Sequence, residues 1–189
     1  MRFSLLLLSL LVAACASTRQ PLERGALSPD TVVVIPTRNL SGRPLLVPEI
    51  YLGDAVGKAA HLKVDNIDLA TLSEAAVYSR LSELGYRVEL EQNVARFAEA
   101  PKYEAHSAIT VFDMDETRST GRYRMGIIVM LVRAVDQVEV ARGYSEQEFQ
   151  LLDEAPDEVG ALGTARFIEQ RLQIYTEGLA RDAVDAGGF

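Results

Sequence analysis

The sequence predicts an α+β fold: a single domain with a mainly antiparallel sheet, an early βαβ unit, a three-strand meander and a long C-terminal helix. One observation is the apolar strand pattern at residues 31–35, which is followed by one helical pattern and a second strand pattern. Another is the change to an apolar period of two from residue 105, where three strand patterns follow one another across short connections. A helical stripe then closes the chain after residue 160. Strands gathered ahead of a terminal helix, rather than alternating with helices throughout, are typical of this class.

The first fourteen residues predict a cleaved export signal. They read MRFSLLLLSLLVAA and are followed by Cys15. Arg2 supplies a positive charge, and residues 5–12 form an apolar run too short to cross a bilayer as a mature helix. The letters VAAC at residues 12–15 resemble the lipobox of bacterial lipoprotein signals. That resemblance implies that Cys15 is lipidated and becomes the first residue of the mature protein.

The lipobox divides the chain into a signal peptide at residues 1–14, a lipidated flexible tether at residues 15–30 and a periplasmic α+β domain at residues 31–189. Cys15 is the only cysteine, so no internal disulfide can form. Several acyl chains hold a protein stably on a membrane. In enteric bacteria Asp after the cysteine retains lipoproteins at the inner membrane, so Ala16 favours the outer membrane, facing the periplasm. The alternative is an ordinary signal peptide that leaves Cys15 as a free thiol.

Charge and composition exclude some classes of function. The chain carries 27 acidic against 19 basic residues, a net charge of −8, so it lacks the basic footprint of a nucleic-acid binder. Its residues are 48% hydrophobic, which is enough to build a core in a domain of this size. We therefore expect one folded domain.

The first half of the domain opens with the β-branched run at residues 31–35, which predicts a strand buried on both faces. Residues 37–67 combine glycines and prolines with apolar side chains, and predict either a short hairpin or helical turn over the sheet or a docking surface. Asp68 is placed to cap a helix that Gly85 ends. A strand at residues 86–91 follows, and then a short helix or loop at residues 93–103, broken by Pro101.

The second half predicts strands at residues 105–113, 122–135 and 138–149, with a tight turn near Asp136 and Gln137. Residues 127–132 are apolar on both faces. The last helix is expected at residues 161–183, because one apolar stripe recurs at three-four spacing. The stripe consists of Ala165, Ile168, Leu172, Tyr175 and Leu179.

No catalytic or metal-binding motif emerges. His61 and His106 lie in different elements without cysteine or acidic neighbours at ligand spacing, so no zinc site is expected. The acidic cluster of Asp113, Asp115 and Glu116 lacks the ligand pattern of a calcium loop and predicts a solvated hairpin tip. There is no G-x-S-x-G motif. We expect no cofactor, no metal and no enzymatic activity.

A short motif provides a family resemblance. A strand ending in Ile35-Pro36, followed by Asn39-Leu40-Ser41-Gly42, resembles the opening of the domain shared by the curli-secretion lipoprotein, the amino-terminal domain of the Tol β-propeller protein and the lipoprotein activator of penicillin-binding proteins. The insertion at residues 43–67 is longer than that opening usually allows, and the turn near residue 136 lacks the usual glycine.

The order of elements is equally similar to the lipopolysaccharide-translocon lipoprotein, although that family usually begins Cys-Gly, where this chain has Cys15-Ala16. Both resemblances imply a non-catalytic accessory lipoprotein, anchored in the membrane by its N-terminal lipid, that binds another envelope protein in an assembly or transport machine. The alternatives are a lipoprotein that binds a lipid or small hydrophobic ligand between sheet and helices, and an envelope enzyme.

A partner-binding surface is expected where the loop meets the last helix. Phe167 and Ile174 lie two turns apart on a helix face roughly opposite to the buried stripe. With Leu45, Leu46 and Tyr51 they would form an exposed apolar patch of the kind that marks interaction sites. The alternative is that the loop covers the two helix residues or that they are scattered surface residues.

Overall fold

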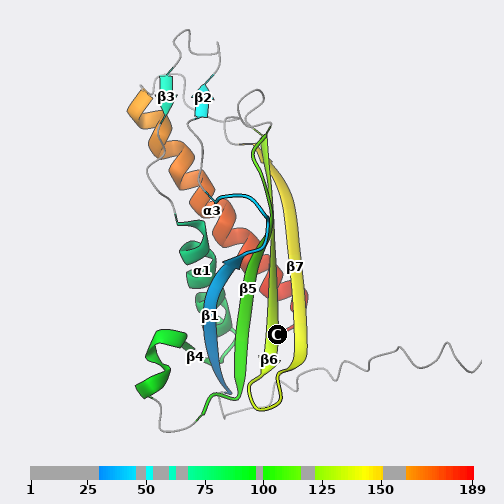
Figure 1. Cartoon of the computed structure of the whole chain (residues 1–189). Coiled ribbons are helices and arrows are strands. Elements are labelled where there is room, and N and C mark those ends of the chain that lie inside the picture. Colours follow the sequence, from blue (N-terminus) through cyan, green and yellow to red (C-terminus); the bar gives the residue numbers. More distant parts are fainter. Residues whose placement is uncertain are drawn as a thin grey trace, which may run out of the picture.

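The computed structural model (Figure 1) describes residues 30–45, 50–52, 60–62, 68–96, 100–115, 122–150 and 161–189. Its centre is a five-stranded sheet with the strand order β4-β1-β5-β6-β7. The strands are β1 (Thr31–Asn39), β4 (Arg87–Leu90), β5 (Tyr103–Asp113), β6 (Arg122–Arg133) and β7 (Val138–Gln150). The predicted α+β class is confirmed.

Both predicted topological features are present in this sheet. β1 pairs in parallel with β4, and the intervening helix α1 (Leu69–Glu83) makes the early βαβ unit. β5, β6 and β7 pair antiparallel in sequence order, which is the three-strand meander. β1 also pairs in parallel with β5 and so joins the two halves.

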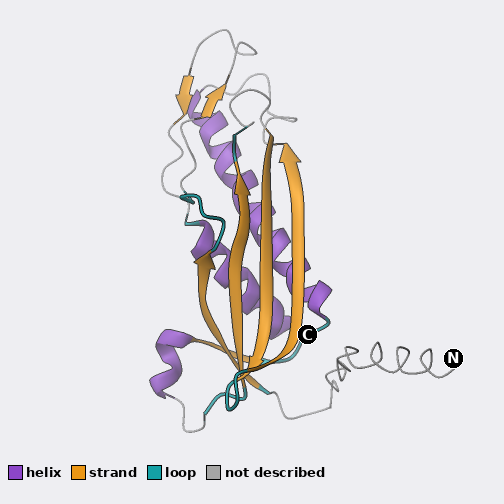
Figure 2. Ribbon diagram, turned by 45° about the vertical axis from the view of Figure 1, so that its right-hand side comes forward, coloured by secondary structure: helices purple, strands orange, loops and turns teal. Residues whose placement is uncertain are grey.

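The helices α1 and α3 (Ala161–Gly187) lie on the same face of the sheet (Figure 2). α1 packs on β1 and β4, whereas α3 packs on β6 and β7 and against α1. The core between these layers contains fully buried side chains from both, such as Val34, Leu81, Ile127 and Leu172. A short 3-10 helix, η2 (Glu91–Arg96), follows β4.

The long insertion forms a hairpin where it is described. β2 (Ile50–Leu52) and β3 (Ala60–Leu62) pair antiparallel and make a second, two-stranded sheet. β3 lies against α3 rather than over the main sheet.

Local sequence signals explain how α1 begins and ends. The Asp68 carboxylate accepts hydrogen bonds from the backbone N–H groups of Ala70 and Thr71, each at 3.1 Å, so the predicted cap is confirmed. Gly85 follows the helix with φ at +93°, a conformation that costs glycine little.

Several boundaries differ from the prediction by a few residues, and two of these differences have a clear physical reason. β1 continues past Pro36 to Asn39, because its register with β5 shifts between Ile35 and Arg38 and the proline sits in that irregularity. α3 continues to Gly187, beyond the expected residue 183, and the chain then turns back at Gly188, where φ is +64°. The Phe189 side chain is thereby buried in the core.

Candidate functional site

The two faces of the main sheet differ in what covers them. Side chains alternate between the faces along each strand. On β6, Ile127, Val129 and Leu131 are fully buried beneath the helices. The residues between them point to the other face, which no described helix or strand covers, as Figure 2 shows. We call this second face the open face.

The open face has an apolar middle. Cross-strand pairing places Ala108, Ile128 and Tyr144 in one row over β5, β6 and β7. Ile35, His106 and Met130 form the next row. Ile35, Ile128 and Met130 are half-buried, and the Tyr144 side chain is 45% exposed. We define the open-face patch as Ile35, Ala108, Ile128, Met130 and Tyr144.

The Tyr144 hydroxyl reaches the Gly126 position on β6, one pair along the strand from the Ile128 that Tyr144 faces directly. A Cβ atom at Gly126 would lie 2.8 Å from the Tyr144 hydroxyl oxygen and 3.2 Å from Cβ of Val111. The hydroxyl therefore occupies space that a side chain at Gly126 would need. The hydroxyl hydrogen-bonds to Glu146, and partial burial, together with that bond, raises the pKa of Tyr144.

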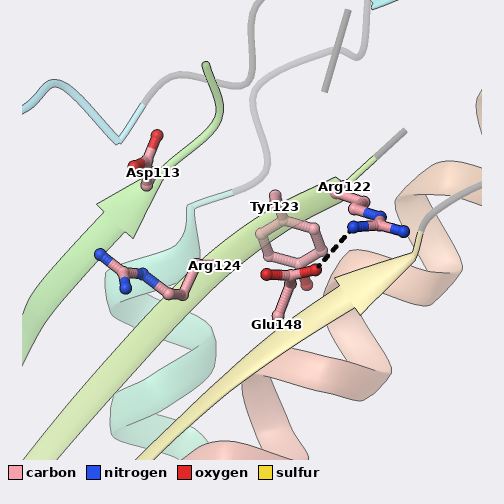
Figure 3. A pocket seen from close by; sticks show the side chains of 5 residues that line it. All are labelled: Asp113, Arg122, Tyr123, Arg124 and Glu148. Atoms are coloured by element: carbon pink, nitrogen blue, oxygen red, sulfur yellow. Dashed lines mark ion pairs between the residues drawn. The ribbon is translucent and has the colours of Figure 1, made fainter. Parts of the chain in front are cut away.

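Charged side chains border the apolar middle. Two rows from Ile128 toward one end of the sheet, Asp113, Arg124 and Glu148 are cross-strand neighbours. They line, with Arg122 and Tyr123, a small cavity of about 220 Å³ (Figure 3). The cations there already have acidic partners: Arg122 lies 3.6 Å from Glu148, and Arg124 lies 3.5 Å from Glu146. The site is small and its lining charges are paired, unlike the mostly apolar pockets that bind drug-sized ligands.

Tyr123 connects this cavity to the helix layer. Its ring stacks on Phe149 at 5.1 Å between centroids, and Phe149 stacks on Tyr175 of α3 at 4.4 Å. Among the described residues the Tyr123 hydroxyl has no hydrogen-bond partner. Burial, and to a smaller extent Tyr175, raises the pKa of Tyr123, so this phenol stays protonated.

The motif that carried the family resemblance builds a turn after β1. The Asn39 side-chain oxygen accepts hydrogen bonds from the backbone N–H and the hydroxyl of Ser41, at 3.1 and 2.7 Å. The turn delivers the Arg43 guanidinium to Asp115 at 2.7 and 3.0 Å, and this partner lowers the pKa of Asp115. The four residues therefore have a local structural role.

The predicted site residues are only partly described. Cys15 and Leu46 lie outside the described residues, as does most of the expected tether. Tyr51 lies in β2, but its side chain is outside the described part. Leu45 is half-buried and packs against the main core.

The two helix residues of that prediction have different environments. Ile174 is 62% exposed on α3. Phe167 is half-buried, and the Arg171 guanidinium lies over its ring at 4.9 Å. Their role in binding a partner stays a prediction.

One feature of the sequence indicates the open-face patch. Residues 127–132 are apolar on both faces, although helices cover only one face of the sheet. Therefore, no described helix covers the second apolar face of β6. Long-range pairing was needed to bring Ile128 and Met130 beside Ile35 and Tyr144.

Within the described ranges, no three acidic, histidine or cysteine side chains converge in a way that could hold a metal ion. In the same part of the chain, no helix is both long enough and apolar enough to cross a membrane.

The fold defines an α+β domain with two helices on one face of a five-stranded sheet. The chain resembles a variant of the PelC dodecamer from Paraburkholderia phytofirmans, with a TM-score of 0.50 and 13% identity, covering 84% of this chain and 87% of that chain. At this identity the likeness shows the fold alone.

Two further solved structures are similar at lower scores. Protein XCC0632 from Xanthomonas campestris, of family DUF330, has a TM-score of 0.47 and 12% identity, covering 87% of this chain and 89% of that chain. Lipoprotein GNA1162 from Neisseria meningitidis has a TM-score of 0.42 and 12% identity, covering 76% of this chain and 96% of that chain. No protein-family model matches the chain. Comparison with curated protein sequences also finds no match.

Proposed function

We propose that this chain is a non-catalytic, lipid-anchored accessory protein of the cell envelope that binds another envelope protein through the open-face patch. The anchor is the Cys15 lipid, and the domain faces the periplasm from the outer membrane. The VAAC sequence at residues 12–15 and the single cysteine support the anchor.

The open face is the observation that carries the binding role. It presents apolar side chains, bordered by charged ones, on four adjacent strands of the sheet. An apolar centre inside a polar rim is the common anatomy of a protein interface. β7 also forms one edge of the sheet, so a partner strand could extend the sheet there.

Photo-crosslinking in living cells tests this role. A photoreactive amino acid placed at Met130 lies in the patch, whereas the same residue at Ala75, an exposed position of α1, serves as the matched control. We expect a covalent adduct with another envelope protein from position 130 and none from position 75. A Tyr144→Asp substitution should remove the adduct, because it places a charge in the apolar middle. An adduct from position 75 alone, or one unaffected by Tyr144→Asp, would contradict the proposed surface.

Crosslinking at Ile174 compares the open-face patch with the surface predicted from the sequence. An adduct from position 174 and none from position 130 would mean that the partner binds the α3 surface and not the open-face patch. An adduct whose only protein component is this chain would indicate self-assembly.

The anchor is tested separately through Cys15. Replacing it with Ser should abolish incorporation of labelled palmitate, because no other cysteine can accept the lipid. Unchanged labelling of the Cys15→Ser variant would contradict the anchor and the localisation together.

Binding of a lipid or small hydrophobic ligand between sheet and helices is the second candidate. In the described part of the chain that space is filled by buried side chains from both layers, and the small cavity lies at the sheet's charged end instead. The geometry therefore favours protein binding. Mass spectrometry of a solvent extract of the purified protein would detect a stoichiometric lipid if this alternative holds.

A further inference from the structure

Two apolar side chains are exposed to solvent at the β6–β7 turn, one within the turn and one at the first residue of β7. Val135 is 87% exposed and Val138 is 48% exposed. The turn itself is well defined: the Gln137 N–H donates to the Arg133 carbonyl at 2.8 Å, and the Arg133 guanidinium lies 2.8 Å from the Asp136 carboxylate. Single exposed valines are common on protein surfaces, so exposure alone does not indicate a function for these two. Their location in the fold does.

The turn lies at the end of the sheet where β1 begins (Figure 1). The Ala134 N–H donates to the Lys102 carbonyl at 3.0 Å, and the Lys102 N–H donates to the Thr31 carbonyl, also at 3.0 Å. The Lys102 ammonium contacts both oxygens of the Asp30 carboxylate at 2.8 Å. These contacts link Asp30, the last residue of the expected tether, to the β6–β7 turn through Lys102.

The length of chain ahead of Asp30 limits how far this end can lie from a lipid on Cys15. A flexible chain of about 15 residues has a root-mean-square span of roughly 20 Å. Its extended limit is roughly 50 Å. A weak contact near the tether's attachment point is therefore presented to the membrane at an effective concentration on the order of millimolar. Two valines, too weak to bind a membrane alone, gain from this tethering.

The two cations beside the turn are paired with acidic side chains. The exposed Lys102 and Arg133 side chains pair with Asp30 and Asp136, respectively. No unpaired cation among these residues would attract acidic headgroups, so contact with a lipid surface would depend on apolar burial. This favours a membrane interface of any headgroup charge over one rich in anionic lipid.

We infer that the β6–β7 turn lies against the membrane to which the chain is anchored, with Val135 and Val138 entering the headgroup region. This inference rests on the proposed lipid anchor. It orients the sheet with its strands standing away from the membrane, so that the charged end around Asp113 lies farthest from the membrane and the open face is accessible from the side.

A single-label experiment tests the orientation. Cys15 is the only native cysteine and is acylated in the mature lipoprotein, so a cysteine introduced at position 135 is the only free thiol. The Val135→Cys variant carries an environment-sensitive fluorophore. Leu40→Cys is the matched control, because Leu40 is 63% exposed and follows the opposite end of β1 from Asp30. Both variants are purified with their lipid and incorporated into vesicles of phosphatidylethanolamine and phosphatidylglycerol.

We expect the emission at position 135 to shift to the blue and to be quenched by a headgroup-linked quencher, with neither effect at position 40. Both effects should persist in vesicles of phosphatidylcholine alone and at high salt, because the contact is apolar. Adding Val138→Asp to the labelled variant should reverse them.

Flotation of the vesicles distinguishes the two hypotheses. If the protein floats but position 135 remains in an aqueous environment like position 40, the inferred orientation is wrong and the anchor stands. If the mature protein fails to float, the anchor and the orientation that rests on it are both wrong. Equal shifts at positions 135 and 40 would also contradict the orientation.

Discussion

The covered and open faces of the same sheet are built from alternate residues of the same strands, yet their side chains have different surroundings. Ile127 on β6 is fully buried beneath the helices, whereas the adjacent Ile128 is half-buried on the open face. Local sequence differs little between the two positions. The helix layer is what makes one face a core and leaves the other available for binding.

Ion pairs between α1 and α3 connect the two helices of the layer that covers one face of the sheet. The Arg181 guanidinium of α3 contacts Glu83 of α1 at 2.6 and 3.0 Å, and Arg80 contacts Asp185 at 2.8 Å. These exposed pairs orient two helices whose apolar stripes supply most of the attraction. We therefore expect substitutions on the covered face to reduce stability, and substitutions on the open face to reduce binding.

Adjacent isoleucines on β6 give the largest expected difference. Ile127→Ala should reduce the free energy of unfolding by about 2–5 kcal/mol, because it leaves a cavity in a packed core. Ile128→Ala removes a side chain that is already partly in solvent, and should cost roughly 1 kcal/mol. Urea denaturation of both variants measures the difference. Equal losses would mean that the open face is covered as completely as the other.

Contact between β7 and α3 depends on Gly143. A Cβ atom there would lie 1.7 Å from the Ala183 carbonyl oxygen and 2.5 Å from the Gly187 nitrogen, both of which are backbone atoms. Gly143→Ala should therefore destabilise the protein by about 1–3 kcal/mol or more, because the helix must move off the sheet.

Gly178 provides the matched control within α3. A Cβ atom at Gly178 would meet no atom within 4 Å. Gly178→Ala should stabilise the helix by about 0.5–1 kcal/mol, through lower backbone entropy in the unfolded chain. Thermal melts of the two variants should shift in opposite directions. A destabilised Gly178→Ala protein, or an unchanged Gly143→Ala protein, would contradict the described packing of α3.

The smallest effect is expected at the start of α1. Asp68→Ala should cost about 1 kcal/mol, because two backbone N–H groups lose their acceptor. The hydrogen bonds to Thr71 lower the pKa of Asp68 in the folded state. The contribution of Asp68 is therefore fully present above its unfolded pKa of about 4, and is lost as the pH falls through the lower folded value.

The difference in unfolding free energy between the native chain and Asp68→Ala, measured from pH 7 down to pH 2, checks this sign. A difference that grew as the pH fell would contradict the role of the carboxylate as a helix cap. Thr71→Val, which removes the side-chain hydrogen bond to Asp68 but keeps the backbone donors, should give a smaller loss.

Much of the candidate site was not predictable from the sequence for reasons visible in particular residues. The expected surface combined Leu45 with Ile174, but Leu45 packs on the main core and Ile174 is exposed on α3. The open-face patch joins residues from four strands, and the Tyr144 hydroxyl lies where a side chain at Gly126 would be. Neither arrangement follows from the period of any single strand.

The sequence by itself determined the order and type of the main elements and the cap at Asp68, because each depends on spacing and side-chain chemistry within a few residues of the chain. Tertiary structure alone decided the strand order, the burial of Phe189 and the close approach of Gly143 to α3. It also decided that Lys102 links the β6–β7 turn to Asp30. These features depend on contacts between residues far apart in sequence, which form only when the whole domain closes around its core.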